Sequence, residues 1–510
     1  MKLIQIIGIT LLIAGCQTTS PETNTELTKN ASKRPNILFL IADDWSYPHA
    51  SIYGDPVVQT PTFDFLASQG ALFTNAYCAS PSCTPSRGAI LTGRYPHQLE
   101  GAGNLWSIIP TKFPNWVSIL EHEGYFAGSQ DKGWGPGDFK RGGYEHNPAG
   151  PFFESFDDFM KQRPEGKPFC YWFGSTDPHR AYETNSGVKT GMKAEDIVVP
   201  EFLPDLPCVR NDIMDYYFEV ERFDRRCGNI LRTLKEAGEL ENTLVVVTSD
   251  NGMPFPRAKA NVYDYGTRMP LVAYWPGQID ASTTNDEFIN AIDLGPTFLE
   301  AAGIPVPEEM SGTSFLSLAK GENDHVDRSH VFLERERHAN VRKGDLSYPM
   351  RAVRNHDYLY IRNFMPDRNP AGDPEAHQSV GQYGDVDNSI SKFLIMDMEG
   401  EENEPNYFEL TFGKRPAEEL YILAEDPYQL NNVAGEATYG SVLEELKDRL
   451  ELWMATSGDL RATDPKTIYW DTVVYTPTYD FDNYDLEAKI AEYQMLRQST
   501  YSRFDTVGCK

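Results

Sequence analysis

A cysteine, a proline and an arginine follow one another at a spacing that suits chemistry at the start of a helix. They are Cys83, Pro85 and Arg87 in the string CTPSRGAILTGR of residues 83–94. Proline is favoured in the first turn of a helix, so Arg87 lies one turn beyond Cys83 and its guanidinium can hold anionic oxygens near the sulfur. The structural alternative is a small buried cysteine in front of a helix, and the pentapeptide alone does not exclude it.

Oxygen ligands end two apolar runs elsewhere in the chain. Asp43 and Asp44 follow residues 37–42, and Asp250 and Asn251 follow residues 244–248. Continuous apolar runs of this length are typical of strands buried in a parallel sheet, whose carboxyl edge binds ligands. Either pair alone is more often a cap or a turn. Two pairs on separate buried strands predict a site for a hard cation, Ca²⁺ or Mg²⁺ rather than zinc.

These elements predict an α/β fold. A third apolar run, residues 168–173, leads to His179, and residues 217–234 and 115–123 carry helical periodicity. Residues 180–212 lack strong periodicity and are expected to form an excursion over the surface. We predict a large, mostly parallel sheet flanked by helices over residues 34–325. A smaller C-terminal α+β subdomain over residues 326–510 is predicted to hold an antiparallel sheet of short strands (331–333, 350–353, 358–361) and a helix at 442–454.

Composition limits the partners. The 510 residues carry a formal net charge of −29, which argues against a nucleic-acid partner because phosphate backbones require a basic surface. An anionic substrate must therefore meet a local pocket of positive charge. Seven cysteines are too few for a disulfide scaffold, and their irregular spacing supports no metal finger.

The N-terminus is expected to be a processing signal. Lys2 precedes a short apolar run that is too short for a comfortable membrane span, and the run ends in Cys16. Residues 13–16, IAGC, resemble the bacterial lipobox, which implies a signal peptide over residues 1–16 and a lipid on Cys16. Gln17 then favours the outer membrane, with residues 17–33 as a flexible tether. An ordinary cleaved secretory signal is the alternative.

Residues 83–94 resemble the signature of the type I sulfatases, C-x-P-x-R followed by T-G-R, in the alkaline phosphatase-like superfamily. The resemblance covers residues 34–435 and implies that a maturation enzyme, formylglycine-generating or anaerobic, oxidises Cys83 to formylglycine (3-oxoalanine). One hydroxyl of the hydrated aldehyde would attack sulfur, and the other would later expel sulfate as the aldehyde reforms. A plain thiol has no such exit.

The same resemblance implies the roles of other residues. Asp43, Asp44, Asp250, Asn251 and an oxygen of modified Cys83 would bind one calcium ion, and Arg87 would hold the nucleophile. Lys132 and Lys259 match lysines that contact sulfate, and His179 matches a histidine that protonates the leaving group or binds sulfate. Further substrate-binding candidates are charged residues near motif ends or in the C-terminal subdomain: Arg180, Arg257, Arg337, His338 and Arg351.

One motif departs from the family pattern. Where the family often has G-K-W-H, this chain reads DKGW over residues 131–134, so Trp134 replaces the histidine thought to assist release of sulfate. His97 is one candidate for a substitute base. The string around His179 and the segment 254–256 look closest to the heparan N-sulfoglucosamine sulfohydrolase-like branch of bacterial carbohydrate sulfatases.

The resemblance predicts a lipid-anchored envelope enzyme that removes sulfate esters from a sulfated polysaccharide or its oligosaccharides. An algal glycan such as ulvan is favoured slightly over a glycosaminoglycan, and the membrane is contacted only through the lipid. Three alternatives remain open: an N-sulfamidase on a heparan-type sugar, a phosphoester or phosphonate hydrolase, and a glycan-binding lipoprotein without activity.

Overall fold

The computed structural model describes residues 34–323, 325–375, 381–402, 404–473, 486–504 and 507. The predicted signal peptide and tether, with Cys16, lie outside the described residues. The described residues from Arg34 onward belong to one compact unit. Within the described ranges, no helix combines the length and the apolar character that a membrane crossing requires.

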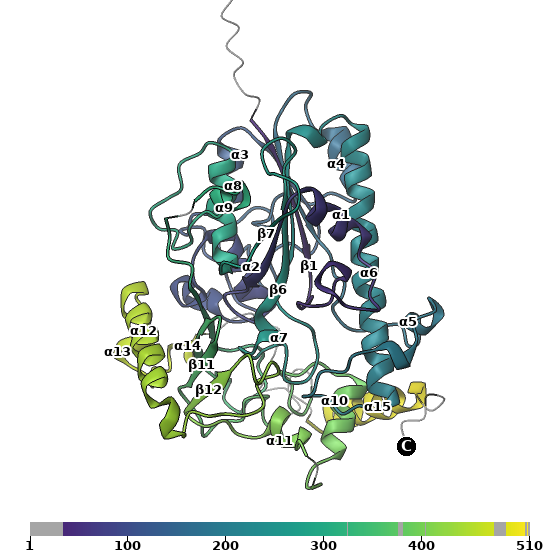
Figure 1. Cartoon of the computed structure of the whole chain (residues 1–510), viewed down its shortest axis with the longest axis vertical. Coiled ribbons are helices and arrows are strands. Elements are labelled where there is room, and N and C mark those ends of the chain that lie inside the picture. The colour runs from purple at the N-terminus through teal and green to yellow at the C-terminus, as the bar shows by residue number, and fades with distance from the viewer. Residues whose placement is uncertain are drawn as a thin grey trace, which may run out of the picture. The chain divides into compact units, whose positions relative to one another are not determined.

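The core of the molecule is a mixed sheet that has eight strands within the described residues (Figure 1). Four neighbouring strands in the order β3-β4-β1-β5 are parallel, and β6 and β2 continue the sheet as an antiparallel pair at its other side. Its strands are β1 Asn36–Ala42, β2 Ala71–Tyr77, β3 Phe126–Asp131, β4 Phe169–Gly174, β5 Thr243–Ser249, β6 Arg268–Tyr274, β7 Thr283–Asn285 and β8 Ile289–Asn290.

The central strand β1 is buried on both faces. Leu38 and Leu40 contribute to one hydrophobic core, whereas Phe39 and Ile41 contribute to the other, because successive side chains of a strand point to opposite faces. Helices α1 Pro61–Gln69, α4 Phe156–Gln162 and α6 Pro207–Glu236 cover the first face. Helices α2 Cys83–Thr92, α3 Trp116–His122, α8 Leu294–Ala301 and α9 Leu316–Ala319 cover the second (Figure 1).

A second sheet is antiparallel, with the strand order β12-β11-β10-β9. Its strands are β9 His330–Arg335, β10 Met350–Asn355, β11 Tyr358–Asn363 and β12 Glu418–Ile422. Leu446, Leu450 and Trp453 of α12 Gly440–Ser457 pack on Val353 and Tyr360 of this sheet. In Figure 1 β1 runs downward from the top, and this sheet lies near its lower end. The remaining helices are α5 Ser186–Lys189, α7 Asp264–Thr267, α10 Ile390–Asp397, α11 Tyr407–Phe412, α13 Leu460–Thr463, α14 Tyr469–Thr472 and α15 Leu486–Phe504.

The predicted fold class is confirmed, because the sheet is mostly parallel and the later strands form an antiparallel sheet. One boundary is wrong. Residues 207–212 were expected in a surface excursion, but α6 begins at Pro207. Its first turns bury polar side chains such as Asn211, Asp212 and Asp215, which conceal the apolar periodicity. Asp212 pairs with Arg180, and Asp215 accepts hydrogen bonds from the backbone of Asn185 and Gly187.

Candidate active site

Four acidic or thiol side chains meet at the carboxyl edge of the large sheet. Ligand atoms of Asp43, Asp44, Cys83 and Asp250 all lie within 4.8 Å of one another, and all four residues are buried. Strands β1 and β5 are parallel neighbours in register, so the residues that follow them meet at one edge. The amide of Asp44 donates to Asp250 Oδ1 at 3.1 Å, and α2 brings Cys83 Sγ to 3.5 Å from Asp43 Oδ1. The predicted motifs therefore converge.

The donor set suits a hard cation. Three buried carboxylates would repel one another without positive charge between them. Asn251 donates from Nδ2 to Asp44 Oδ1 at 2.7 Å, while its own Oδ1 is buried and has no hydrogen-bond partner among the described residues. Carboxylate and amide oxygens are the ligands that Ca²⁺ and Mg²⁺ prefer. Asp43, Asp44, Asp250 and Asn251 could hold such an ion, with residue 83 adjacent.

Positive side chains surround this acidic cluster. Lys132 Nζ lies 2.7 Å from Asp43 Oδ2, and Arg87 Nε donates to Asp250 Oδ2 at 2.8 Å. Lys259 Nζ donates to Asp44 Oδ2 at 2.7 Å. The guanidinium of Arg87 is fully buried, and its Nη2 has no hydrogen-bond partner among the described residues. These three cations balance the three carboxylates, so a bound cation would give a chain of net charge −29 the local positive pocket that an anionic substrate requires.

The site shifts the pKa values of its acids in different directions. Burial opposes ionisation of Asp43, but Lys132, His179, Arg87 and Lys259 outweigh it and hold the pKa of Asp43 well below its ordinary value. Burial raises the pKa of Asp250 to about 6, against the attraction of Arg87. Burial also raises the pKa of the Cys83 thiol well above its ordinary value, although Lys132 and Lys259 oppose this. Cys83 is a free thiol, and in this neutral form it is a weak nucleophile.

The cluster opens into a cavity of about 760 Å³. Cys83, Lys132, His179 and Lys259 line it, and so does Arg180. His179 Nε2 is 3.9 Å from Asp44 Oδ2, and its side chain is 35% exposed, so the ring can reach a bound molecule. Arg180 forms two hydrogen bonds to Asp212 at 2.7 and 2.8 Å, which fixes it in the cavity wall.

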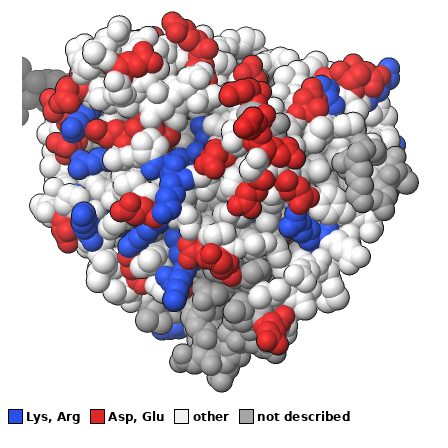
Figure 2. All heavy atoms as spheres, turned by 90° about the horizontal axis from the view of Figure 1, so that it is seen from below, with Lys and Arg blue, Asp and Glu red and all other residues white. Residues whose placement is uncertain are grey.

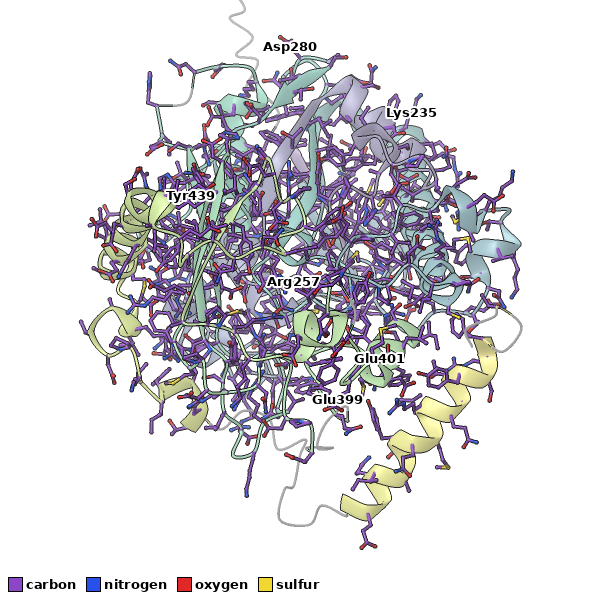
Figure 3. The ribbon with its side chains drawn as sticks, turned by 60° about the horizontal axis from the view of Figure 1, so that its bottom comes forward. Lys235, Arg257, Asp280, Glu399, Glu401 and Tyr439 are labelled. Atoms are coloured by element: carbon purple, nitrogen blue, oxygen red, sulfur yellow. The ribbon has the colours of Figure 1, made fainter. Side chains whose placement is uncertain are left out.

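Three arginines predicted to bind substrate do not line this cavity: Arg257, Arg337 and Arg351. Arg257 is 2% exposed, donates to the carbonyl of Leu410 and lies over the ring of Tyr263. Figure 3 places it among densely packed side chains, in contrast to Lys235 at the rim of the molecule. Arg337 is 2% exposed and donates to the carbonyl of Asp345. Each is held by buried structural contacts, so sequence position near a motif was misleading.

Arg351 and His97 are likewise structural. Arg351 is fully buried and donates to Asp459 at 2.6 Å and to Glu336 at 2.7 Å. His97 Nδ1 lies 2.7 Å from Glu334 Oε2 in the same buried network. Burial opposes protonation of His97, but the Glu334 carboxylate outweighs it and raises its pKa. His97 does not line the cavity, so the structure does not support it as a substitute base.

The cavity is also lined by residues that no sequence motif identifies as site residues. His338 and Asp387, which come from beyond the large sheet, line it together with Trp106 and Trp134. Asp387 Oδ2 lies 3.3 Å from Lys259 Nζ. No motif marks Asp387 or Trp106, because both lie in loops and reach the cavity only through the tertiary fold. His338 was a candidate from its position alone.

The sulfatase family model matches residues 35–304, which is more than half of the chain. The chain belongs to the sulfatase family. A second family model, the C-terminal domain of N-sulphoglucosamine sulphohydrolase, matches residues 257–369. The predicted kinship with sulfatases of the heparan sulfamidase type is therefore confirmed, and this sulfatase is a hydrolase.

Curated relatives span most of the chain. An ulvan-active sulfatase of Formosa agariphila is 28% identical over 84% of this sulfatase and 76% of its own length. A second ulvan-active sulfatase of that bacterium is 29% identical over 84% of this chain and 82% of its own. The N-sulphoglucosamine sulphohydrolase of Homo sapiens is 26% identical over 83% and 90%.

Solved structures share the fold. One was determined with its substrate D-glucosamine-2-N,6-O-disulfate, and it matches 85% of this sulfatase and all of its own chain with a TM-score of 0.60 at 20% identity. The phosphonate monoester hydrolase of Agrobacterium radiobacter matches 84% of this sulfatase and 97% of its own chain with a TM-score of 0.61 at 17% identity. Structural similarity at this level of sequence identity establishes the shared fold only.

Proposed function

We propose that this sulfatase hydrolyses sulfate esters of a sulfated polysaccharide or its oligosaccharides through a formylglycine made from Cys83, with one bound calcium ion. The observation that carries the proposal is the position of Cys83. Its Sγ lies 3.5 and 4.0 Å from the Oδ1 atoms of Asp43 and Asp44, whose carboxylates contact Lys132, Arg87 and Lys259. A calcium ion there would polarise the sulfate and favour the ionised nucleophile.

The side chains around the cluster have complementary roles in this proposal. Lys132 and Lys259 would bind the sulfate oxygens, and Asp43 and Asp44, which these lysines contact, would hold the ion. Arg87 is locked by hydrogen bonds to Asp250 and to the carbonyl of Lys132 at 2.7 Å, which leaves Nη2 for an oxygen on residue 83. His179 faces the cavity and is placed to donate a proton to the leaving oxygen.

Several observations support a carbohydrate substrate. The cavity volume is in the range that suits a sugar-sized ligand. Trp106 lines it, and its aromatic side chain provides a flat apolar surface beside the polar groups of the cavity. Two relatives are named for activity on ulvan, so we favour a sulfated algal glycan over a glycosaminoglycan. Figure 2 shows a band of Lys and Arg across one face, with Asp and Glu on either side, which offers a polyanion a local path on an acidic protein.

N-desulfation of a heparan-type sugar is the second candidate. It is supported by the match of residues 257–369 to the C-terminal domain of N-sulphoglucosamine sulphohydrolase and by the human relative of that name. Phosphonate or phosphoester hydrolysis shares the fold, as the Agrobacterium structure illustrates. Release of sulfate from ulvan oligosaccharides, compared with release from N-sulfated glucosamine and with cleavage of a phosphonate ester, separates the three activities.

We further propose that the protein is anchored by a lipid on Cys16, on the outer membrane, and that a formylglycine-generating or anaerobic maturation enzyme modifies Cys83. The lipobox-like residues 13–16 and the CTPSR string of residues 83–87 support these two proposals. Metabolic labelling with a fatty acid, lost in Cys16→Ala, tests the anchor.

The decisive experiment is mass spectrometry of a peptide spanning residues 72–87 after co-expression with the maturation enzyme. The expected result is the mass of formylglycine at position 83, with sulfate release that Cys83→Ala abolishes. An unmodified thiol in a fully active protein, or full activity of Cys83→Ala, would refute the proposal and leave a glycan-binding or phosphoryl-type function to be tested.

A further inference from the structure

Trp134 occupies the position at which the family motif often carries a histidine, and it cannot replace the chemistry of that residue. The indole is 3% exposed, and its Nε1 has no hydrogen-bond partner among the described residues. Indole nitrogen is a donor only and accepts no proton. A methyl group added to Gly88 of α2 would meet Trp134 Nε1 at 3.4 Å, so the ring packs against the helix that begins at Cys83. Another group must take up a proton when sulfate leaves residue 83.

A different histidine reaches the same cavity from the segment after β9. His338 Nδ1 lies 2.8 Å from the hydroxyl of Ser82, the residue directly before Cys83. His338 lines the cavity together with Cys83, Lys259 and Ala339. Ala339 also packs in one apolar cluster with Cys83. Within the described residues the ring makes this one hydrogen bond, which leaves Nε2 for the cavity.

The backbone on both sides of His338 is fixed. The amide of Arg337 donates to Asn104 Oδ1 at 2.9 Å, and the carbonyl of Arg337 accepts from the amide of Leu105 at 3.2 Å. The amide of Ala339 donates to Asp385 Oδ1 at 2.9 Å. Asp385 is itself held by Arg335 and Arg342. A group that must meet a reacting atom needs this kind of support, because a small displacement sharply lowers its efficiency.

We propose that His338, oriented by Ser82, is the general base that releases sulfate from residue 83. Nδ1–H donates to Ser82 Oγ, which leaves Nε2 as the acceptor. The inference rests on the proposed formylglycine chemistry. One geminal hydroxyl of hydrated residue 83 has received the sulfate, and Nε2 takes the proton of the other. The electrons of that O–H bond form the carbonyl, the bond from carbon to the sulfate oxygen breaks, and its electron pair leaves on sulfate. Water then rehydrates the aldehyde, and the proton passes from His338 to solvent.

The surroundings of His338 favour the neutral ring that a base requires. Burial lowers the pKa of His338 to about 3; Asp385 and Asp387 oppose this shift, and Lys259 and Arg335 add to it. A sulfate held in the cavity brings negative charge next to the ring, which raises the pKa and strengthens the base at the moment it is needed.

The test separates formation of the sulfated residue from its breakdown. His338→Asn keeps a side chain that can bond to Ser82 and removes Nε2. We expect the desulfated sugar to appear in a first-turnover burst at the wild-type rate, while steady-state kcat falls about 100-fold. Mass spectrometry of the peptide spanning residues 72–87 should show sulfate retained on residue 83. His122→Asn, whose side chain is 88% exposed, is the matched control and should leave both phases unchanged.

Two further measurements test the role of His338. Trp134→His in the His338→Asn background should restore part of kcat and remove the trapped sulfate. Nitrogen NMR of histidine-labelled protein with unmodified Cys83 should show His338 protonated at Nδ1 and bare at Nε2. Burst and steady-state rates that fall together, no retained sulfate, or a proton on Nε2 would overturn the assignment. If instead the wild-type peptide carries an unmodified cysteine, the proposed function fails and not the role of His338 alone.

Discussion

The ammonium of Lys259 lies 3.3 Å from Asp387 Oδ2, so a carboxylate from the connection between β11 and β12 fixes a lysine from the segment that follows β5. The same ammonium donates to Asp44 at 2.7 Å. Burial opposes the charge on Lys259, but Asp387 and Asp44 outweigh it and raise the pKa of Lys259 well above its ordinary value. The lysine is therefore a permanent cation, which contacts Asp387 on one side and the acidic cluster of Asp43, Asp44 and Asp250 on the other.

Replacing Lys259 should lower the catalytic efficiency of the enzyme strongly. If Lys259 binds sulfate as proposed, Lys259→Met removes a charged contact worth about 1.5–3 kcal/mol, so kcat/KM on the sulfated glycan should fall roughly 10- to 100-fold. Lys235→Met, at the exposed end of α6, is the control and should retain the wild-type value. A Lys259→Met enzyme with unchanged kcat/KM would show that the lysine does not touch the sulfate.

Calcium affinity should depend on pH through Asp250. Its pKa in the ion-free site is raised to about 6, and a carboxyl must lose its proton to bind the ion. Affinity should therefore be nearly constant above about pH 7 and should fall about tenfold per unit well below pH 6. Titration calorimetry at several pH values measures this. Asp250→Asn should bind calcium weakly at every pH; a wild-type affinity that is flat down to about pH 5 would contradict the role of Asp250.

Arg351 should affect stability and leave substrate binding intact. Its guanidinium is fully buried and bridges Asp459 and Glu336. Arg351→Met leaves the buried carboxylate of Asp459 without its guanidinium partner, while Glu336 keeps Arg461. We expect the free energy of unfolding to fall by about 3–5 kcal/mol. KM of the folded fraction should not change. Denaturant unfolding and kinetics below the transition measure the two quantities, and a raised KM at normal stability would restore Arg351 as a substrate-binding residue.

Lys392 should make stability rise with pH in the alkaline range. Burial lowers its pKa to about 7, although Asp387 and Asp385 oppose the shift. In the unfolded chain a lysine titrates near about pH 10.4. Between these values the unfolded state binds a proton that the folded state does not, so this group adds roughly 1.4 kcal/mol of stability per pH unit as pH rises.

Lys392→Met removes this pH-dependent contribution to the free energy of unfolding. The difference in unfolding free energy between wild type and Lys392→Met should therefore grow in favour of wild type from about pH 7.5 to about pH 9.5. Urea denaturation at both pH values measures it, and Lys235→Met should show no such trend. Parallel pH profiles for wild type and Lys392→Met would mean that Lys392 keeps its charge in the folded state.

The parts of the site that could be predicted lie where strand or helix ends carry a recognisable string. Asp43, Asp250 and Cys83 follow or begin elements whose apolar runs are unambiguous, so their convergence could be anticipated. Asp387 and the role of His338 could not, because loops bring them to the cavity through contacts far apart in sequence. Arg257 and Arg351 were predicted to bind substrate because they are charged residues near motifs or in the C-terminal subdomain. Their guanidinium groups instead bind a buried carbonyl and a buried carboxylate, which the sequence does not reveal.

Every residue of α2, from Cys83 to Thr92, is buried. A second enzyme that must bind this segment and reach the sulfur cannot do so once the helix is packed against α3 and α8. The proposed oxidation of Cys83 is therefore confined to the interval between synthesis and folding, and the two processes compete for the same chain. The fraction of active molecules then reflects how slowly the domain folds as much as how fast it is modified. If activity requires the proposed modification, a molecule that folds with an unmodified Cys83 stays inactive for as long as it stays folded.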